Sequence, residues 1–259
     1  MTIGVFDSGL GGLTVVASVL KHLHGADIHY VADTAHAPYG EKTFDDIRRY
    51  AFDITRTLRK RFDIDALVIA CNTATAAAVA DLRRHFPDLL IIGTEPGIKP
   101  AALATRSGTV GVLATPATIA GDKYKTLAHT LQNDFTFTLI EQPCPGLADR
   151  IEAGKAEDEE TEKMLRRWLE PMRDKGVDTI VLGCTHYPLV APVIRRIMGD
   201  RVTLIDTGDA VARHLADRLR DRITKDNTRP SRLFVYATGD INTDAVARIV
   251  GFYPPVAAW

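Results

Sequence analysis

"FDIDALVIACNTAT", residues 62–75, and "KGVDTIVLGCTHYP", residues 175–188, follow the same plan. In each, a charged segment of helical length leads through aspartate into an apolar run of five or six residues, and a cysteine follows. Short apolar runs rich in β-branched residues indicate buried strands. Because the plan occurs twice, it predicts two similar lobes.

The other apolar runs extend this pattern along the chain. Strands that are apolar throughout, separated by helix-length segments such as 44–62 and 73–86, are typical of parallel sheets covered on both faces. We therefore predict an α/β fold of two similar lobes, each a mainly parallel sheet flanked by helices. The remaining predicted strands are "TIGVF" (2–6), "DIHYVAD" (27–33), "LLIIGT" (89–94), "TVGVLAT" (109–115), "FTFTLIE" (135–141), "VTLID" (202–206) and "RLFVYAT" (232–238).

The lobe boundaries follow from this repetition. The second similar pair, "IGVFDSGLGGLTV" and "VGVLATPATIA", places a lobe start near residue 1 and another near residue 96. After residue 207 we expect one helix, the strand 232–238 and a final helix, which are too little for a third lobe. The predicted domains are thus 1–95 plus 208–259, and 96–207.

The charge balance and the lengths of the apolar runs indicate which partners the protein can have. The chain has 259 residues, 32 Lys+Arg against 33 Asp+Glu, and a net charge of −1. This balance does not favour nucleic acid as a primary partner, because phosphate binding needs a basic surface. No secretory h-region or run of about 20 apolar residues is found, so we expect a cytoplasmic protein without a membrane partner.

The three cysteines are Cys71, Cys144 and Cys184, an odd number that argues against a disulfide framework. In open parallel sheets, ligands bind beyond the carboxyl ends of the strands, where we expect Cys71 and Cys184. Both are expected at helix starts, where the helix dipole lowers a thiol pKa from about 8.5 toward neutrality. Cys144 is interpreted as a buried apolar residue.

Other uses of two cysteines remain open from the residues alone. A structural zinc site needs four ligands, usually with Cys-x-x-Cys spacing, which this chain lacks. A redox dithiol would also be expected to show Cys-x-x-Cys spacing, which this chain lacks. A cysteine hydrolase would need one nucleophile with a separate base and would leave the second cysteine unused.

Polar residues follow each cysteine. Asn72 and Thr73 follow Cys71, and Thr185 and His186 follow Cys184. They could cap helices, and they could also donate hydrogen bonds to a bound carboxylate. Capping and binding are compatible.

The glycine-rich stretch "FDSGLGG" and the loop "APYG" supply further polar groups. Neither matches a nucleotide-binding motif. A tight turn is the simple interpretation of the first stretch; alternatively, Ser8 and backbone amides bind a carboxylate while Asp7 meets an ammonium group. With Tyr39 and Gly40, the predicted site suits an amino acid.

The chain resembles glutamate racemases, the cofactor-independent enzymes of the aspartate/glutamate racemase superfamily. The resemblance extends over nearly the whole chain. It is carried by "GVFDSGLGGLTV" (4–15), "ADTAHAPYG" (32–40), "LVIACNTATAAA" (67–78), "EPGIKPA" (95–101), "GVLATPATI" (111–119), "LGCTHYPL" (182–189) and "LIDTGDAVA" (204–212).

The resemblance implies an active site in the cleft between the lobes and a two-base mechanism that uses neither pyridoxal phosphate nor a metal. Cys71 would be the base toward D-glutamate and Cys184 the base toward L-glutamate, with Asp7 and His186 tuning the two thiols. Glu152 matches a family position near the second cysteine, and His36 stands where many relatives have arginine. The implied substrate contacts are Asp7, Ser8, Tyr39, Gly40, Asn72, Thr73, Thr185 and His186.

Two further expectations complete the interpretation. The side-chain carboxylate of glutamate needs donors of its own, for which we suggest Thr115 or Thr118. The resemblance also implies a homodimer that supplies D-glutamate for peptidoglycan precursors. A binding or regulatory protein that kept the amino-acid site is the alternative, and the presence of both cysteines argues against it.

Overall fold

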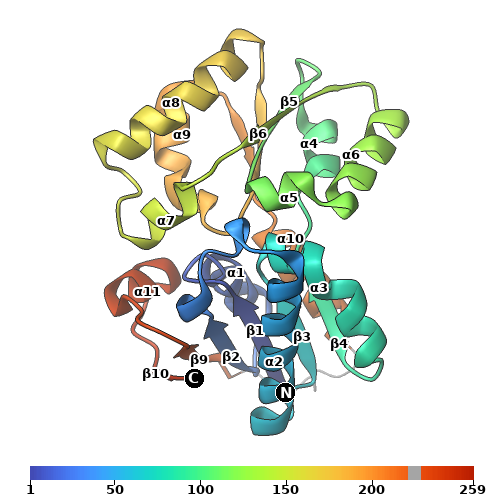
Figure 1. Ribbon diagram of the computed structural model, residues 1–259, viewed down its shortest axis with the longest axis vertical. Coiled ribbons are helices and arrows are strands. Elements are labelled where there is room, and N and C mark those ends of the chain that lie inside the picture. Colours follow the sequence, from blue (N-terminus) through green and yellow to red (C-terminus); the bar gives the residue numbers. More distant parts are fainter. Residues whose placement is uncertain (221–228) are drawn as a thin grey trace. The chain divides into compact units, whose positions relative to one another are not determined.

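The structure, a computed structural model, describes residues 1–220 and 229–259. The part of the expected first lobe at residues 221–228 lies outside the described residues. The chain divides into two compact units. Unit 1 comprises Met1–Thr94 with Gly208–Trp259, and unit 2 comprises Glu95–Thr207 (Figure 1).

Unit 1 is a six-stranded parallel sheet in the order β10-β9-β2-β1-β3-β4. Helices α1, α10 and α11 pack on one face, while α2 and α3 pack on the other (Figure 1). Its strands are β1 Thr2–Asp7, β2 Asp27–Ala32, β3 Ala66–Ile69, β4 Leu90–Gly93, β9 Arg232–Ala237 and β10 Val256–Ala258. Its helices are α1 Leu13–His22, α2 Phe44–Phe62, α3 Asn72–His85, α10 Gly208–Leu219 and α11 Thr243–Val250, with 3₁₀ turns η1 Thr34–His36 and η2 Tyr39–Glu41.

Unit 2 is a four-stranded parallel sheet in the order β6-β5-β7-β8. Helices α4 and α6 cover one face, and α7, α8 and α9 cover the other. Its strands are β5 Thr109–Ala114, β6 Thr138–Pro143, β7 Thr179–Gly183 and β8 Thr203–Ile205. Its helices are α4 Ile98–Ala104, α5 Pro116–Ala120, α6 Asp122–Asp134, α7 Leu147–Glu152, α8 Glu159–Asp174 and α9 Ala191–Met198, with the 3₁₀ turn η3 Tyr187–Val190.

The two sheets share one strand order. The run β2-β1-β3-β4 in unit 1 corresponds to β6-β5-β7-β8 in unit 2. The repeated sequence plan therefore specifies equivalent strands, β3 and β7, and each is followed by a cysteine. A glycine also occupies equivalent positions of β1 and β5. A Cβ on Gly4 would lie 2.9 Å from the Ile64 side chain, and one on Gly111 would lie 3.0 Å from the Met172 side chain, so both strands pack closely against the residues that cover them.

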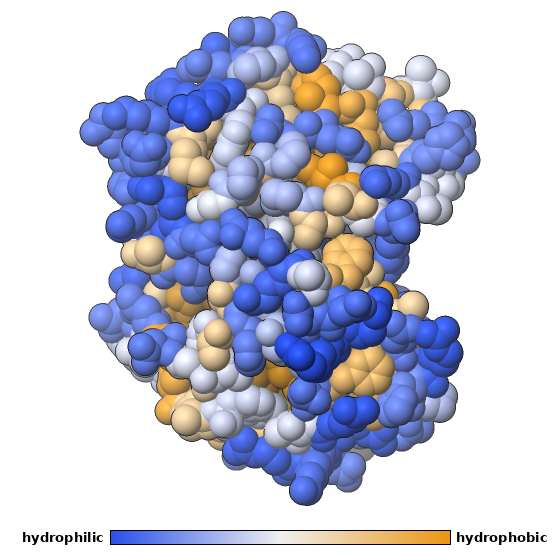
Figure 2. Space-filling model, in the orientation of Figure 1, coloured by the Kyte–Doolittle hydropathy of each residue, from blue (hydrophilic) through white to orange (hydrophobic). Residues whose placement is uncertain are grey.

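The central strands β1, β3, β5 and β7 are buried because both faces of each sheet carry apolar side chains. In β1, Ile3 and Val5 point to the face covered by α1, and Phe6 points to the face covered by α2. Successive side chains of a strand point to opposite faces, so a strand that is apolar throughout contributes to a core on each side of its sheet. Figure 2 shows that hydrophilic residues make up most of the visible surface, with scattered hydrophobic ones. Among the described residues, no helix is long and apolar enough to cross a membrane.

Local signals set the helix ends. Thr43 caps α2, its hydroxyl oxygen accepting the N–H of Asp46 at 3.2 Å. The left-handed Asp63 follows the last residue of α2. The predicted helix 44–62 is confirmed, and the predicted helix 73–86 lies at 72–85.

The fold class, parallel sheets covered by helices on both faces, is confirmed, as are all nine predicted strands, with shifts at their ends. The expectation that the chain ends with a helix was wrong. A short strand, β10, follows α11 and pairs with β9. Only three residues long and at the sheet edge, β10 follows two prolines, and its apolar run is too short to indicate a strand.

Candidate functional site

Three strand ends of unit 1 place polar residues at one edge of its sheet. Asp7 is the last residue of β1, Asp33 follows β2, and Cys71 comes two residues after β3. In the parallel register, Asp7 pairs with Ala32 and Phe6 pairs with Ile69. The carboxyl ends of the three strands are therefore neighbours, as expected for a ligand site in this class of sheet.

The loop after β1 holds the Asp7 carboxylate in a fixed position. Asp7 is fully buried, and its Oδ1 accepts the N–H of Gly9 at 3.2 Å and the hydroxyl of Ser8 at 3.4 Å. A Cβ on Gly12 would lie 2.5 Å from the Asp7 Cβ and 2.8 Å from the Tyr30 hydroxyl. Gly12 is thus needed for close packing against Asp7.

Cys71 caps the N-terminus of α3. Its Sγ accepts the N–H of Ala74 at 3.4 Å, and its side chain is almost fully buried. A sulfur at this position lies at the positive end of the helix dipole, where negative charge is favoured. The prediction that Cys71 lies at a helix start is confirmed.

Asn72 and Thr73 form the first turn of α3 and are buried. Among the described residues, the side-chain Nδ2 of Asn72 has no hydrogen-bond partner. Buried polar atoms are nearly always hydrogen-bonded in proteins, so this amide is a donor with room for an acceptor. A bound carboxylate would supply that acceptor.

Tyr39 is held by Asp33, a residue that the sequence analysis did not single out. The Tyr39 hydroxyl donates to Asp33 Oδ2 at 2.5 Å, and both side chains are buried. Burial first, and then the charge of Asp33, raise the pKa of Tyr39 well above its ordinary value, so the phenol stays protonated. Gly40 follows in the same 3₁₀ turn, η2. A polar residue directly after a buried strand is the signal that could have identified Asp33.

His36 shares the Asp33 carboxylate. Its Nδ1 lies 2.8 Å from Asp33 Oδ1, and its ring stacks on Tyr50 with centroids 4.0 Å apart. His36 therefore helps to order the loop between β2 and α2.

Unit 2 presents its own pair of strand ends. Ala114 of β5 pairs with Gly183 of β7, so the residues that follow the two strands are neighbours. Thr115 caps α5, and its hydroxyl donates to the Thr118 hydroxyl at 2.9 Å. Cys184 follows β7 directly.

Cys184, His186 and Glu152 form a hydrogen-bonded series within unit 2. The Cys184 Sγ lies 3.6 Å from His186 Nδ1, and His186 Nε2 lies 2.5 Å from Glu152 Oε1. Burial opposes protonation of His186, but its bonds to Cys184 and Glu152 prevail and raise its pKa well above the ordinary value. A protonated His186 places positive charge beside the Cys184 sulfur. Thr185, the residue between Cys184 and His186, is also buried, and its hydroxyl lies 3.5 Å from His186 Nδ1.

The expectation that Cys184 begins an α-helix was wrong. A turn follows the cysteine, then the 3₁₀ turn η3 from Tyr187, and the α-helix α9 begins only at Ala191. Pro192 is the reason, because proline is accommodated in the first turn of a helix and breaks the hydrogen-bond ladder further in. The local charge beside Cys184 therefore comes from His186.

Each unit thus brings together its own share of the predicted residues. In unit 1 these are Asp7, Ser8, Tyr39, Gly40, Cys71, Asn72 and Thr73. In unit 2 they are Thr115, Thr118, Cys184, Thr185 and His186, joined by Glu152 from α7.

Cys144 differs from the other two cysteines. It packs in the core of unit 2, and burial raises the pKa of its thiol well above the ordinary value, with a further contribution from Cys184. Within the described ranges, no group of three or more His, Cys, Asp and Glu side chains is arranged to hold a metal ion.

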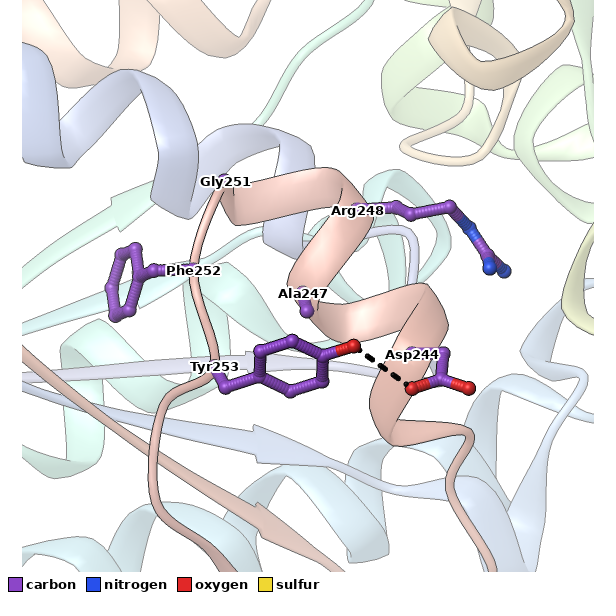
Figure 3. A pocket seen from close by; sticks show the side chains of 6 residues that line it. All are labelled: Asp244, Ala247, Arg248, Gly251, Phe252 and Tyr253. Atoms are coloured by element: carbon purple, nitrogen blue, oxygen red, sulfur yellow. Dashed lines mark hydrogen bonds between the residues drawn. The ribbon is translucent and has the colours of Figure 1, made fainter.

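A surface pocket in unit 1 is formed at the end of α11 (Figure 3). The Tyr253 hydroxyl donates to Asp244 Oδ1 at 3.1 Å across it. None of the predicted site residues lines this pocket. Its lining consists of Asp244, Ala247, Arg248, Gly251, Phe252 and Tyr253.

Comparison with known proteins places this geometry in context. The family model described as Asp/Glu/Hydantoin racemase matches residues 3–215. Glutamate racemase from Aliarcobacter butzleri (strain RM4018) is 52% identical over 250 residues, which cover 96% of this chain and 95% of that protein.

Two solved structures are similar throughout. Glutamate racemase isoform RacE1 from Bacillus anthracis has a TM-score of 0.86 at 31% identity, covering 100% of this chain and 97% of its own. Glutamate racemase from Francisella tularensis subsp. tularensis SCHU S4, in complex with D-glutamate, has a TM-score of 0.82 at 29% identity, covering 99% and 95%.

Proposed function

The chain belongs to the Asp/Glu/Hydantoin racemase family and is an isomerase, and we propose that it interconverts L-glutamate and D-glutamate by proton transfer at the α-carbon. One observation carries the proposal. Cys71 and Cys184 follow equivalent strands of two similar sheets, and each sulfur has a hydrogen-bond donor beside it. The complex of the related Francisella enzyme with D-glutamate supports the choice of amino acid.

Two bases are needed to invert a carbon centre. When D-glutamate is the substrate, the Cys71 thiolate takes the α-proton, so that a C–H bond breaks and an S–H bond forms. The Cys184 thiol then gives its proton to the opposite face of the carbanionic intermediate. When L-glutamate is the substrate, Cys184 takes the proton and Cys71 delivers one. The proposal requires both thiols to reach one α-carbon, because a single base would return the proton to the face it left.

The groups around Cys71 suit the amino and carboxylate ends of the substrate. The buried Asp7 carboxylate complements an ammonium group, and Asn72 offers its unpaired side-chain amide to a carboxylate. Donors that are already fixed in position stabilise the charge that develops when the α-proton leaves. Ser8, Tyr39, Gly40 and Thr73 are the further contacts that we assign to unit 1.

The groups around Cys184 place positive charge beside its sulfur. Glu152 holds His186 protonated, and the resulting positive charge lies beside the Cys184 sulfur. We assign the catalytic tuning of Cys184 to His186, and a positioning role to Glu152, which acts through His186. Thr185 contributes a hydroxyl to the substrate.

Of the two alternatives, Thr115 and Thr118, we propose Thr118 as the donor for the side-chain carboxylate of glutamate, because the single hydroxyl proton of Thr115 goes to Thr118. Their hydroxyls lie 2.9 Å apart at the start of α5, which follows β5, the neighbour of the strand that precedes Cys184. Thr118→Val is expected to raise KM for glutamate by about ten-fold, since it removes one hydrogen bond to a charged group. Aspartate, whose carboxylate lies one methylene closer to the α-carbon, is expected to be affected less. Steady-state kinetics with both amino acids measure this difference, and equal losses would count against the assignment.

The test of the proposed function is incubation with L-glutamate in deuterated water, with no pyridoxal phosphate added and the thiols kept reduced. We expect loss of optical activity together with deuterium at the α-carbon of the D-product. Polarimetry and mass spectrometry follow the two signals. If neither changes, for glutamate or for aspartate, the proposal is wrong.

We further propose that the D-glutamate formed supplies peptidoglycan precursors in a bacterial cytoplasm and that the enzyme acts as a homodimer. The resemblance to bacterial glutamate racemases supports these assignments. Sedimentation equilibrium of the purified protein measures the oligomeric state directly.

A further inference from the structure

The turn after β9, formed by Thr238 and Gly239, contacts the loop that carries Tyr39. Thr238 lies 205 residues beyond Asp33 in the sequence. We propose that Thr238 is a positioning residue for the substrate site, which acts through Asp33 to hold the Tyr39 loop in its binding conformation. The inference rests on the proposed function, which assigns Tyr39 and Gly40 to the substrate.

The Thr238 side chain makes two hydrogen bonds to this loop. Its hydroxyl donates to Asp33 Oδ1 at 2.8 Å and accepts the N–H of Ala35 at 3.0 Å. Its main-chain N–H donates to the carbonyl of Ala32 at 3.1 Å. A single threonine thus fixes the chain where it leaves β2.

Asp33 transmits this contact to Tyr39. Its second carboxylate oxygen, Oδ2, accepts the Tyr39 hydroxyl at 2.5 Å, and its N–H donates to the carbonyl of Asp7 at 2.9 Å. Asp33 is 1% exposed, so water does not compete for these bonds. Hydrogen bonds to an ionised carboxylate are about twice as strong as bonds between neutral groups. Thr238 and Tyr39 therefore share one carboxylate, and the main chain of the same residue is fixed to the end of β1.

Gly239 also brings the turn close to the loop. Its N–H donates to the Thr34 hydroxyl oxygen at 3.0 Å. A Cβ at this position would lie 3.1 Å from the Ala35 nitrogen and 3.2 Å from the Thr34 hydroxyl oxygen, closer than ordinary packing. The close approach therefore favours glycine.

The sheet register explains why the contact forms. β9 pairs with β2 in parallel, with Ala237 opposite Ala32, so Thr238 falls opposite Asp33. The C-terminal part of unit 1 thus extends the sheet and also secures a loop of the proposed site. Neither effect requires Thr238 to touch the substrate.

The test uses the full-length protein with Thr238→Val, which keeps the shape of the side chain and removes the hydroxyl. We expect KM for glutamate to rise by about ten-fold while kcat changes by less than about three-fold, as for loss of a bond to a charged group. Amide hydrogen exchange at residues 33–40 is expected to become faster. Thr238→Ser, which restores the hydroxyl, is expected to recover both values.

The matched control is Thr57→Val on α2, where a half-buried hydroxyl donates to the Asp53 carbonyl of its own helix. This variant is expected to leave KM and the exchange of residues 33–40 unchanged. In the Tyr39→Phe background, Thr238→Val is expected to add less to KM than it does alone, because the two residues act through one carboxylate.

Unchanged KM and unchanged exchange in Thr238→Val overturn the inference, as does failure of Thr238→Ser to recover them. These outcomes are separate from failure of the proposed function. If the wild-type protein leaves glutamate unchanged, the proposed function fails, and hydrogen exchange then decides by itself whether Thr238 holds the loop.

Discussion

Cys71 and Cys144 are both buried free thiols, yet their surroundings differ in chemistry. The Cys71 sulfur accepts an N–H at the start of α3. The Cys144 thiol instead donates to the carbonyl of Gln142 at 3.4 Å, and burial raises its pKa. A hydrogen bond to sulfur favours the thiolate, and a hydrogen bond from sulfur favours the thiol. Only the first environment suits a base.

Replacing a proposed base tests this distinction. Cys71→Ala and Cys184→Ala are each expected to lower kcat/KM for racemisation by at least about 100-fold, because a positioned general base contributes about 100- to 10,000-fold and no group replaces it. Racemisation followed by circular dichroism gives the rate. Cys144→Ala is the control, with activity within about three-fold of wild type. Substantial turnover in both base variants would contradict the two-base mechanism.

The charge on His186 depends on Glu152, which leads to a pH prediction. Because its bond to Glu152 helps to raise the pKa of His186, Glu152→Gln lowers that pKa. His186 then loses its proton at a lower pH. If protonated His186 supports the Cys184 thiolate, the alkaline fall in kcat/KM moves to lower pH in the variant.

The measurement is kcat/KM against pH for the wild type and for Glu152→Gln. Glu159→Gln provides the control, since Glu159 is exposed on α8 and pairs with Lys163. Its profile is expected to match that of the wild type. A profile for Glu152→Gln that falls in rate without moving along the pH axis would show that Glu152 acts in another way.

At the level of elements, equivalent helices of the two units end on the same backbone conformation. Asp63 follows α2 with φ of 47°, and Gly176 lies beyond α8 with φ of 77°. The repeated sequence plan aligns these two residues. A left-handed conformation strains side chains, whereas glycine adopts it freely. Unit 2 therefore carries the residue that suits this position, and unit 1 does not.

Exchanging the two residue types is expected to have opposite effects. Asp63→Gly is expected to raise the free energy of unfolding by about 0.5 kcal/mol, and Gly176→Asp to lower it by about 1 kcal/mol. Urea unfolding followed by circular dichroism measures both changes. Effects of the same sign in the two variants would refute the conformational argument.

The elements also show what sequence patterns can specify. The helix 44–62 was predicted correctly because its capping threonine and its charged and apolar faces are encoded locally. The strand β10 was missed because its position depends on pairing with β9, and three residues carry too little pattern. Short edge elements are determined by their neighbours more than by their own residues.

For the whole molecule, the proposed function requires residues of both units to act on one ligand. Glutamate is therefore expected to stabilise the protein, because a ligand that binds only the folded state raises the unfolding temperature. Asn72→Ala in unit 1 and Thr185→Val in unit 2 are each expected to reduce this increase. Differential scanning fluorimetry over a range of glutamate concentrations gives the shift for each variant.

The control for this measurement is Thr57→Val, which is expected to keep the full shift. If only one of the two site variants changes the shift, the ligand depends on one unit, and the assignment of substrate contacts to both units is wrong.

The sequence by itself determined the α/β class, the two similar sheets and the two cysteines that follow equivalent strands. These features are local, because apolar runs, caps and the residue after a strand are encoded within a few positions of one another. The tertiary structure decided how those residues are tuned. Asp33 meets Tyr39 and Thr238, and His186 meets Glu152, only because parallel strands and packed helices bring distant segments together. Hydrogen bonds and charges act over a few ångströms in space, so contacts between residues far apart in sequence are set by the fold.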